Sequence, residues 1–315
     1  MVTGVTVLSD VMGSSPTPDT NGSRDVFSAF VELAVPLVSP EMEIPLVHSL
    51  DMQLAARGES YSDVGDVLKP KVAASWHVFE PFQIRAAYSE GFRAPNLEQI
   101  NATAIRRINT GREDWILCEA TARANNTPFN TGDCDSVSVE GIRSGGPALK
   151  PESSKNFSLG AVFEPTDNLT LTVDWWRIEQ DGLVGLFSDQ NEITLDYLLR
   201  LQGGSNPNVV RDTPDATTAA LYTAAGLTPA GEILNVAQPF TNLDLRETEG
   251  IDYALQYRLD TDRLGDFRFK FNVAQIRKFF QTPSAQAQQI IDAVAAGTIN
   301  NSVDVVAQQN FIRQN

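Results

Sequence analysis

The chain has 315 residues, 42% of them hydrophobic and 20% charged, which excludes a disordered chain and allows one large domain or two ordinary ones. Its formal net charge of −16 argues against nucleic acid as a partner, because phosphate binding needs clustered Lys and Arg. The acidity fits a solvated surface, or a lumen or loops that attract cations. No run of about 18 apolar residues is present, which excludes a membrane-spanning helix but leaves open membrane-spanning strands of about 9–11 residues.

Eight segments of the chain alternate between apolar and polar or small residues. In one of them, Val72, Ala74 and Trp76 alternate with Ala73 and Ser75. Successive side chains of a strand point to opposite faces, so each segment predicts a strand with one apolar face and one wet face. The predicted strands are 27–35, 50–57, 71–78, 82–89, 156–164, 169–175, 251–260 and 267–273.

Short and long connections take turns between these strands. The short ones are 80–81, 165–168 and 261–266, and the expected long ones are 60–67, 94–152 and 181–235. Alternation alone also fits a soluble β-sandwich. Compact soluble domains rarely contain structureless loops of many tens of residues, whereas outer-membrane barrels combine tight periplasmic turns with long extracellular loops. The pattern therefore favours an all-β, antiparallel transmembrane barrel portion of about eight strands.

Two stretches have helical spacing, one within the long connection 181–235 and one in the loop segment after the last predicted strand. They are Asn191–Gln202, which ends before Gly203-Gly204, and Ser284–Ala296. We expect both to be loop elements that pack on a barrel rim.

Six sequence blocks, in order and with their spacing, resemble the barrel portion of TonB-dependent receptors between about Phe27 and Phe280. The blocks are Lys69–Val72 with Tyr88–Leu97, Leu149–Glu152 with Asp174–Glu179, and Phe240–Asn242 with Glu249–Asp252. The family-motif residues are Gly91, Phe92, Arg93, Ala94, Pro95, Lys150, Pro151, Glu152, Gly250 and Asp252.

The motif residues also have a reading from physical chemistry alone. Gly91 lets a strand bend, and Pro95 ends its ladder because proline has no N–H and restrains Ala94. Lys150-Pro151-Glu152 restarts a strand after the long connection. For both motifs, Gly91–Pro95 and Lys150–Glu152, we prefer a role in ending or starting a strand at the extracellular rim over contact with a substrate.

The resemblance implies a receptor in the bacterial cell outer membrane, surrounded by outer-membrane lipid. Such a receptor binds a small nutrient with its extracellular loops and a plug domain, and TonB energises its passage. The ligand classes are ferric siderophore, cobalamin, haem and oligosaccharide. No cofactor is implied, and no bond is made or broken.

The resemblance also sets an expected organisation of the chain. We expect residues 1–25 to be a loop or N-terminal remnant, 26–280 the barrel segment, and 281–315 a truncated extracellular-loop segment. No plug, signal peptide or closing strand is recognisable, which indicates a fragment. Such barrels have about 22 strands, so eight cannot enclose the lumen.

Two groups of residues are candidate sites. Polar strand residues that could line the ligand route, or pack against the plug, are Arg57, Arg85, Asp174, Asp252 and Arg258. The two cysteines, Cys118 and Cys134, suit a disulfide in an oxidising compartment, where it would brace an extracellular loop; two free thiols are the alternative.

Enzyme chemistry has little support in the sequence. His48 and His77 are the only histidines, and no zinc spacing, nucleophile elbow or phosphate-binding loop occurs. The acidic pairs Asp133/Asp135 and Asp212/Asp215 lack the calcium-loop pattern and are expected in turns. The remaining alternatives are a plug-free porin or adhesin barrel and a soluble β-sandwich binding module.

Overall fold

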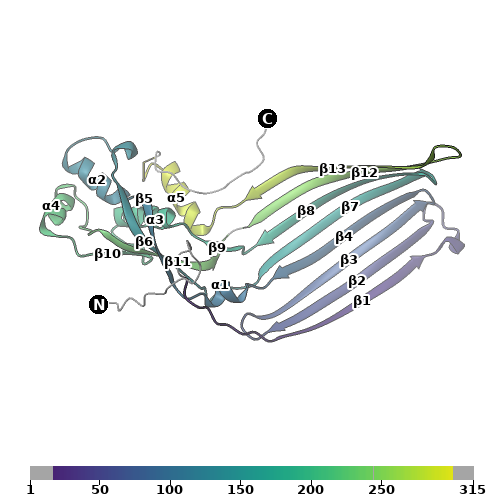
Figure 1. Cartoon of the computed structure of the whole chain (residues 1–315), viewed down its shortest axis with the longest axis horizontal. Helices are drawn as coiled ribbons and strands as arrows, with labels where there is room; N and C mark the ends of the chain where they lie inside the picture. The colour runs from purple at the N-terminus through teal and green to yellow at the C-terminus, as the bar shows by residue number, and fades with distance from the viewer. Residues whose placement is uncertain (1–16, 244, 301–315) are drawn as a thin grey trace.

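The structure, a computed structural model, describes residues 17–243 and 245–300. Its larger part is one antiparallel sheet of eight strands in the order β1-β2-β3-β4-β7-β8-β12-β13 (Figure 1). These strands are β1 (Val26–Val38), β2 (Ser49–Tyr61), β3 (Gly65–Phe79), β4 (Phe82–Arg93), β7 (Glu152–Thr166), β8 (Leu169–Asp181), β12 (Arg246–Thr261) and β13 (Gly265–Gln281). Each of the eight predicted strands lies within one of them, so the predicted fold class is confirmed.

The strand register gathers the apolar residues of all eight strands on one face. Leu159 of β7, for example, lies opposite Ala86 of β4 and Trp175 of β8. Large side chains on this face are exposed, with Leu159 at 52% and Phe271 at 64%. Among the described residues no second sheet pairs with this one or covers its apolar face. An exposed apolar face of this size is what lipid solvates.

The two ends of the sheet differ in their connections. At one rim the links are 39–48, which contains the 3-10 helix η1 (Pro40–Met42), and the tight turns 80–81, 167–168 and 262–264. At the other rim, 94–151 and 182–245 are long. By the usual asymmetry of outer-membrane barrels, the first rim is periplasmic and the second extracellular.

The prediction of a long loop at 60–67 is wrong. Tyr61 pairs with Gly65, which leaves a three-residue turn at 62–64. Gly65 has φ +82, the left-handed conformation that closes a hairpin loop of this length. Arg24 braces the turn through an ion pair of 2.8 Å to Asp63.

The two longest connections are folded, and besides the predicted helix they contain strands and helices that the sequence analysis did not predict. Together with 282–300 they form a second body, here called the cap (94–151, 182–243 and 282–300), beyond the extracellular rim (Figure 1). A five-stranded sheet comprises the path β10-β11-β6-β5 with β9 paired to β11. Its strands are β5 (Ile105–Glu113), β6 (Ser136–Ser144), β9 (Val184–Leu186), β10 (Val209–Arg211) and β11 (Ile233–Asn242). The helices are α1 (Leu97–Asn101), α2 (Trp115–Ala124), η2 (Thr131–Asp133), α3 (Asp189–Leu201), α4 (Ala216–Ala224) and α5 (Ala285–Ala295).

Both helices predicted within the loops are confirmed, as α3 and α5. Each begins at a serine whose hydroxyl accepts a backbone N–H three residues on: Ser188 from Asn191, and Ser284 from Ala287. Such caps satisfy donors that the first turn of a helix leaves free.

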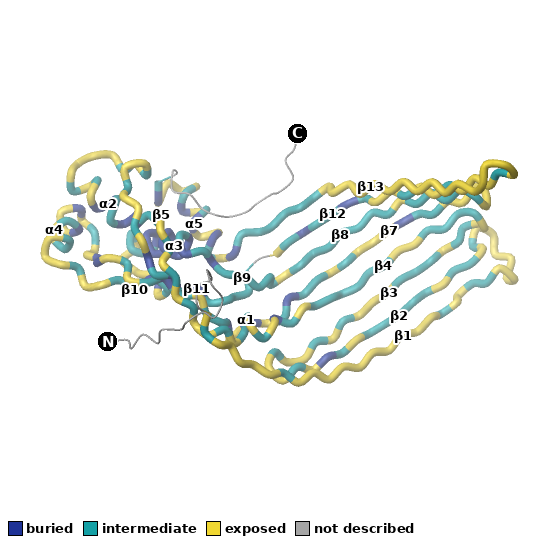
Figure 2. The backbone as a smooth tube through the Cα atoms, viewed as in Figure 1, coloured by how far each residue is buried: buried dark blue, intermediate teal, exposed yellow. Residues whose placement is uncertain are grey.

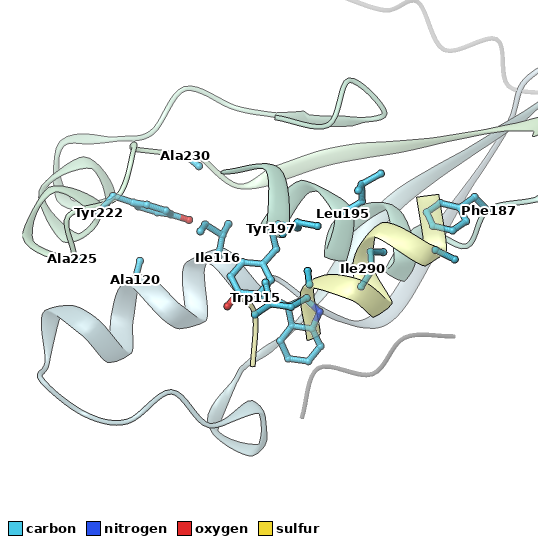
Figure 3. Packing of buried hydrophobic residues seen from close by; sticks show 14 residues of the cluster. Trp115, Ile116, Ala120, Phe187, Leu195, Tyr197, Tyr222, Ala225, Ala230 and Ile290 are labelled. Carbon is cyan, nitrogen blue, oxygen red and sulfur yellow. The ribbon is translucent and has the colours of Figure 1, made fainter. Parts of the chain in front are cut away.

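The hydrophobic core lies in the cap, not in the membrane sheet. Buried residues are concentrated there (Figure 2), and the largest cluster joins α2, α3, α4 and α5 (Figure 3). Trp115, Ile116, Tyr197, Tyr222 and Ile290 are each at most 5% exposed. The cap therefore has its own water-excluded interior, while the sheet has none.

The structure describes only part of the two terminal segments that the sequence predicts. Of the predicted segment 1–25, residues 1–16 lie outside the described residues, as do 301–315 of the predicted segment 281–315. Across the described ranges, no helix is both long and apolar enough to cross a membrane.

Candidate lumenal site and rim junction

The five polar candidates Arg57, Arg85, Asp174, Asp252 and Arg258 all project from the face of the sheet opposite the apolar one. Direct register links three of them across β4, β7, β8 and β12: Arg85 opposes Gly160, Gly160 opposes Asp174, and Asp174 opposes Asp252. Arg57 lies opposite Lys69 toward the extracellular rim, and Arg258 opposite Arg268 toward the periplasmic rim. Their role in lining a ligand route stays a prediction.

Arg85 and Asp174 form an ion pair that crosses an intervening strand. Arg85 Nη2 lies 2.6 Å from Asp174 Oδ2, and Arg85 Nε donates to Oδ1 at 2.9 Å. The pair passes over Gly160 of β7, where a Cβ atom would overlap the Asp174 carboxylate. A glycine at this position is therefore what lets the two charges meet.

A second glycine on the same face seats an aromatic ring. The indole of Trp176 lies over Gly250, where a Cβ would come within 2.6 Å of Trp176 Cζ2. The indole N–H donates to Asp252 Oδ2 at 3.1 Å. The motif residues Gly250 and Asp252 thus hold the Trp176 ring against the polar face of the sheet.

An open hollow of about 710 Å³ lies toward the extracellular ends of β1 to β4. Its cationic lining residues are Arg57, Lys69 and Lys71, its acids are Glu59 and Glu90, and its aromatic residues are Phe30, Tyr61 and Phe92. Glu59 accepts hydrogen bonds of 2.5 Å from Arg57 and Tyr61, so it fixes both side chains. The motif residues Gly91, Phe92 and Ala94 also line the hollow, in addition to ending β4.

Arg93, the last residue of β4, joins Glu152, the first residue of β7. Arg93 Nε donates to Glu152 Oε2 at 2.7 Å, and a second guanidinium nitrogen binds Oε1. Glu152, 5% exposed, also accepts the Val184 N–H at 2.7 Å. Pro95 is fully buried beside this junction. Two motif blocks that lie about sixty residues apart in sequence thus meet at the rim.

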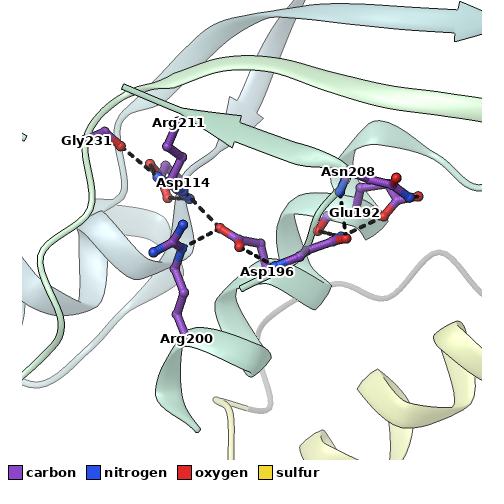
Figure 4. Close-up of polar contacts among 8 residues, drawn as sticks. Asp114, Glu192, Asp196, Arg200, Asn208, Arg211 and Gly231 are labelled. Atoms are coloured by element: carbon purple, nitrogen blue, oxygen red, sulfur yellow. Dashed lines mark hydrogen bonds and ion pairs between the residues drawn. The ribbon is translucent and has the colours of Figure 1, made fainter. Parts of the chain in front are cut away.

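The cap contains a buried ionic network (Figure 4). Arg211 donates two hydrogen bonds to Asp114, at 2.6 and 2.8 Å, and one to Asp196 at 2.9 Å. Arg200 donates to the same Asp196 oxygen at 2.8 Å. Burial opposes the charge of Arg211, yet the two carboxylates outweigh it and raise its pKa. The network holds α2, α3 and β10 in one arrangement.

A buried carboxyl lies near this network on α3 (Figure 4). Glu192 accepts hydrogen bonds from the side-chain amides of Asn206, at 2.7 Å, and Asn208, at 2.9 Å. Burial raises the pKa of Glu192 above its ordinary value, although the two amide hydrogen bonds act in the opposite direction.

Cys118 of α2 and Cys134 after η2 form a disulfide with a Cα–Cα distance of 5.4 Å. The bridge ties the 125–135 segment to α2 inside the cap.

The acidic pairs and histidines have local roles. Asp215 caps α4 by accepting the Thr218 N–H, and Asp133 interacts with Asn130 in a turn. His77 Nδ1 lies 3.0 Å from the Ser49 hydroxyl. Within the part of the chain that the structure describes, no group of three or more His, Cys, Asp or Glu residues is arranged to hold a metal ion.

Comparison with known proteins gives one family and a set of related folds. The family model described as TonB dependent receptor-like, beta-barrel, matches residues 3–289. Among solved structures, the siderophore receptor PirA from Acinetobacter baumannii is 16% identical with a TM-score of 0.51, over 81% of this chain and 28% of that one. A double mutant of the ferric enterobactin receptor PfeA from Pseudomonas aeruginosa gives 16% and 0.51, over 81% and 27%.

At these identities the structural likeness shows the fold alone. The chain spans less than a third of the length of those receptors. No curated protein matches its sequence.

Proposed function

The chain belongs to the TonB-dependent receptor β-barrel family, and from that premise we propose that it forms part of the wall and extracellular cap of a receptor for uptake of a scarce nutrient. The family consists of transporters and receptors, not enzymes, and its place is the outer membrane of Gram-negative bacteria. The lipid-compatible face of the eight-stranded sheet agrees with that location.

The observation that carries the proposal is the hollow beneath the extracellular rim. It lies on the polar face and opens at the rim from which the cap rises. It combines aromatic rings with three cations, of which Arg57 and Lys69 form ion pairs with Glu59 and Glu90. Cationic and aromatic groups together suit an anionic ligand that carries aromatic rings, which they bind through charge and ring contacts. Among the nutrient classes, a ferric siderophore fits this chemistry best. The PirA and PfeA receptors, which share the fold, are siderophore and ferric enterobactin receptors, and this supports the same choice.

After capture at the hollow, the ligand would pass along the polar face of the sheet toward the periplasmic rim. The polar face offers Arg85, Asp174 and Arg258 between the two rims, and TonB together with a plug domain would supply the energised opening. Cobalamin, haem and oligosaccharides are the competing ligand classes.

Two measurements test the proposal in iron-limited cells that make the complete gene product. Uptake of a panel of labelled ferric siderophores is compared with and without TonB, and capture is measured without energy for Lys71→Glu. We expect TonB-dependent uptake, and capture weakened about tenfold or more by the reversed charge. Lys270→Glu, which makes the same change near the periplasmic rim, is the control and leaves capture unchanged. Uptake that does not need TonB would point to a porin, and normal capture by Lys71→Glu would remove the hollow from the route.

A further inference from the structure

Asn242 ends β11 at the point where the chain passes between cap and wall. Its side-chain Oδ1 accepts the Lys150 N–H at 2.9 Å. Its Nδ2 donates to the Lys150 carbonyl at 2.9 Å and to the Gly182 carbonyl at 2.7 Å. One amide group therefore joins three passes of the chain: the approach to β7, the exit from β8 and the end of β11.

The backbone around Asn242 is shaped for these contacts. Gly182 has φ +67, a conformation that favours glycine, and it turns the chain just after β8. Thr241 and Asn242 then pair with Gly185 and Val184 of β9. The Leu243 N–H donates to the Leu183 carbonyl at 2.8 Å.

The Arg93–Glu152 pair lies in the same region. Glu152 accepts the N–H of Val184, the residue that lies opposite Asn242. The ends of β4, β8 and β11 and the starts of β7 and β9 are thus connected by two side chains, Glu152 and Asn242.

We propose that Asn242 is a positioning residue that locks the cap to the membrane wall. Its amide is suited to this because it has one acceptor and two donors, and all of them are used. An aspartate has the same shape but no donor, so it would place a negative charge against the carbonyl oxygens of Lys150 and Gly182. The cap would then keep its own core yet lose its fixed connection to the wall. This inference does not depend on which ligand is captured.

Hydrogen–deuterium exchange of the full chain in detergent or lipid tests the proposal with Asn242→Asp. We expect peptides covering 149–152, 182–186 and 240–243 to exchange about tenfold faster, because each hydrogen bond lost lowers the local opening free energy. Peptides of α2 and α3 in the cap core, and of β7 beyond its first residues, keep their wild-type rates. Asn168→Asp is the matched control. It lies in a periplasmic turn and its side chain accepts a hydrogen bond from Thr166, which an aspartate also does.

Two outcomes would overturn the proposal. One is unchanged exchange of the junction peptides. The other is faster exchange spread evenly over α2 and α3, which would make Asn242 a residue of cap stability and not of cap position. Asn242→Ser serves as the milder variant if the aspartate variant does not fold. It keeps a short donor and acceptor, and we expect its junction exchange to lie between those of wild type and Asn242→Asp.

Discussion

Gly160 shows how a single missing side chain organises the polar face of the wall. The Arg85–Asp174 ion pair occupies the space above it. Its partners come from β4 and β8, the two strands on either side of β7. The adjacent contact of Trp176 with Gly250 repeats the arrangement on the next strand pair. On this face, glycines are positions over which longer side chains reach each other.

Gly160→Ala tests this arrangement. We expect the free energy of unfolding to fall by about 1–3 kcal/mol, because the new methyl group displaces the Asp174 carboxylate. Urea unfolding of the chain in lipid vesicles measures the change. Gly58→Ala is the control, since its methyl group would meet nothing closer than 3.9 Å, and its stability stays within about 0.5 kcal/mol of wild type. An equal loss in both variants would contradict the proposed reason.

Glu192 gives the cap a pH dependence whose sign follows from its raised pKa. The folded state favours the neutral carboxyl, so the contribution of this group is full below its ordinary pKa of 4.5 and is lost as the pH rises through the folded-state pKa. Glu192→Gln remains neutral at every pH. We therefore expect the stability of wild type relative to the variant to decrease between pH 4 and pH 8.

Thermal unfolding of the cap, followed by near-ultraviolet circular dichroism across that range, makes the comparison. A difference between the two proteins that does not change with pH would show that Glu192 titrates alike in the folded and unfolded cap.

At the scale of elements, α2 and its disulfide brace the far side of the cap. The bridge closes a loop with a sequence separation of 16, for which the chain-entropy model gives about 3 kcal/mol. We expect Cys118→Ser with Cys134→Ser to lower cap stability by about that amount and to leave the sheet unaffected. Limited proteolysis within 125–135, with the wall strands as the internal reference, reports the change. Cleavage at the wild-type rate would contradict it.

The sequence predicted the long wall strands well because their signal is local. Alternation over seven or more residues is enough to define a strand, and α3 and α5 each follow an N-cap serine and have a regular apolar spacing. The cap sheet has no such signal. β9 and β10 have three residues each, and β11 pairs with β6 about a hundred residues away. The turn at 62–64 was missed because its closing glycine, Gly65, was read as part of a loop.

The site residues divide in the same way. Side chains on the polar face could be named from their position in a strand, which places Arg85 and Asp174 on the same side without showing that they touch. The contacts of Glu152 and Asn242 could not be named, because their partners lie 32 to 92 residues away. Physical chemistry alone predicted that Lys150-Pro151-Glu152 restarts a strand, and the hydrogen bonds of Glu152 add a second role at the junction.

At the scale of the molecule, the apolar face determines where the wall is stable. Val173→Arg would place a charge in the middle of the lipid-facing surface, and we expect it to cost about 2–4 kcal/mol. Thr172→Arg changes the adjacent residue of the same strand, which faces the polar side, and we expect it to assemble like wild type. Folding into lipid vesicles, followed by heat-modifiable gel mobility, separates the two. Equal losses would mean that the lipid side has been assigned to the wrong face.

The position of the hydrophobic core outside the membrane means that this polypeptide is built for two solvents. The hydrophobic effect stabilises the cap, because Trp115, Tyr197 and Ile290 are buried away from water. The sheet is instead stabilised by lipid acyl chains against its apolar face. Aqueous denaturants should therefore melt the outer portion first, and bilayer thickness should alter only the inner one. The exterior can in this way change in sequence without altering the part that crosses the bilayer.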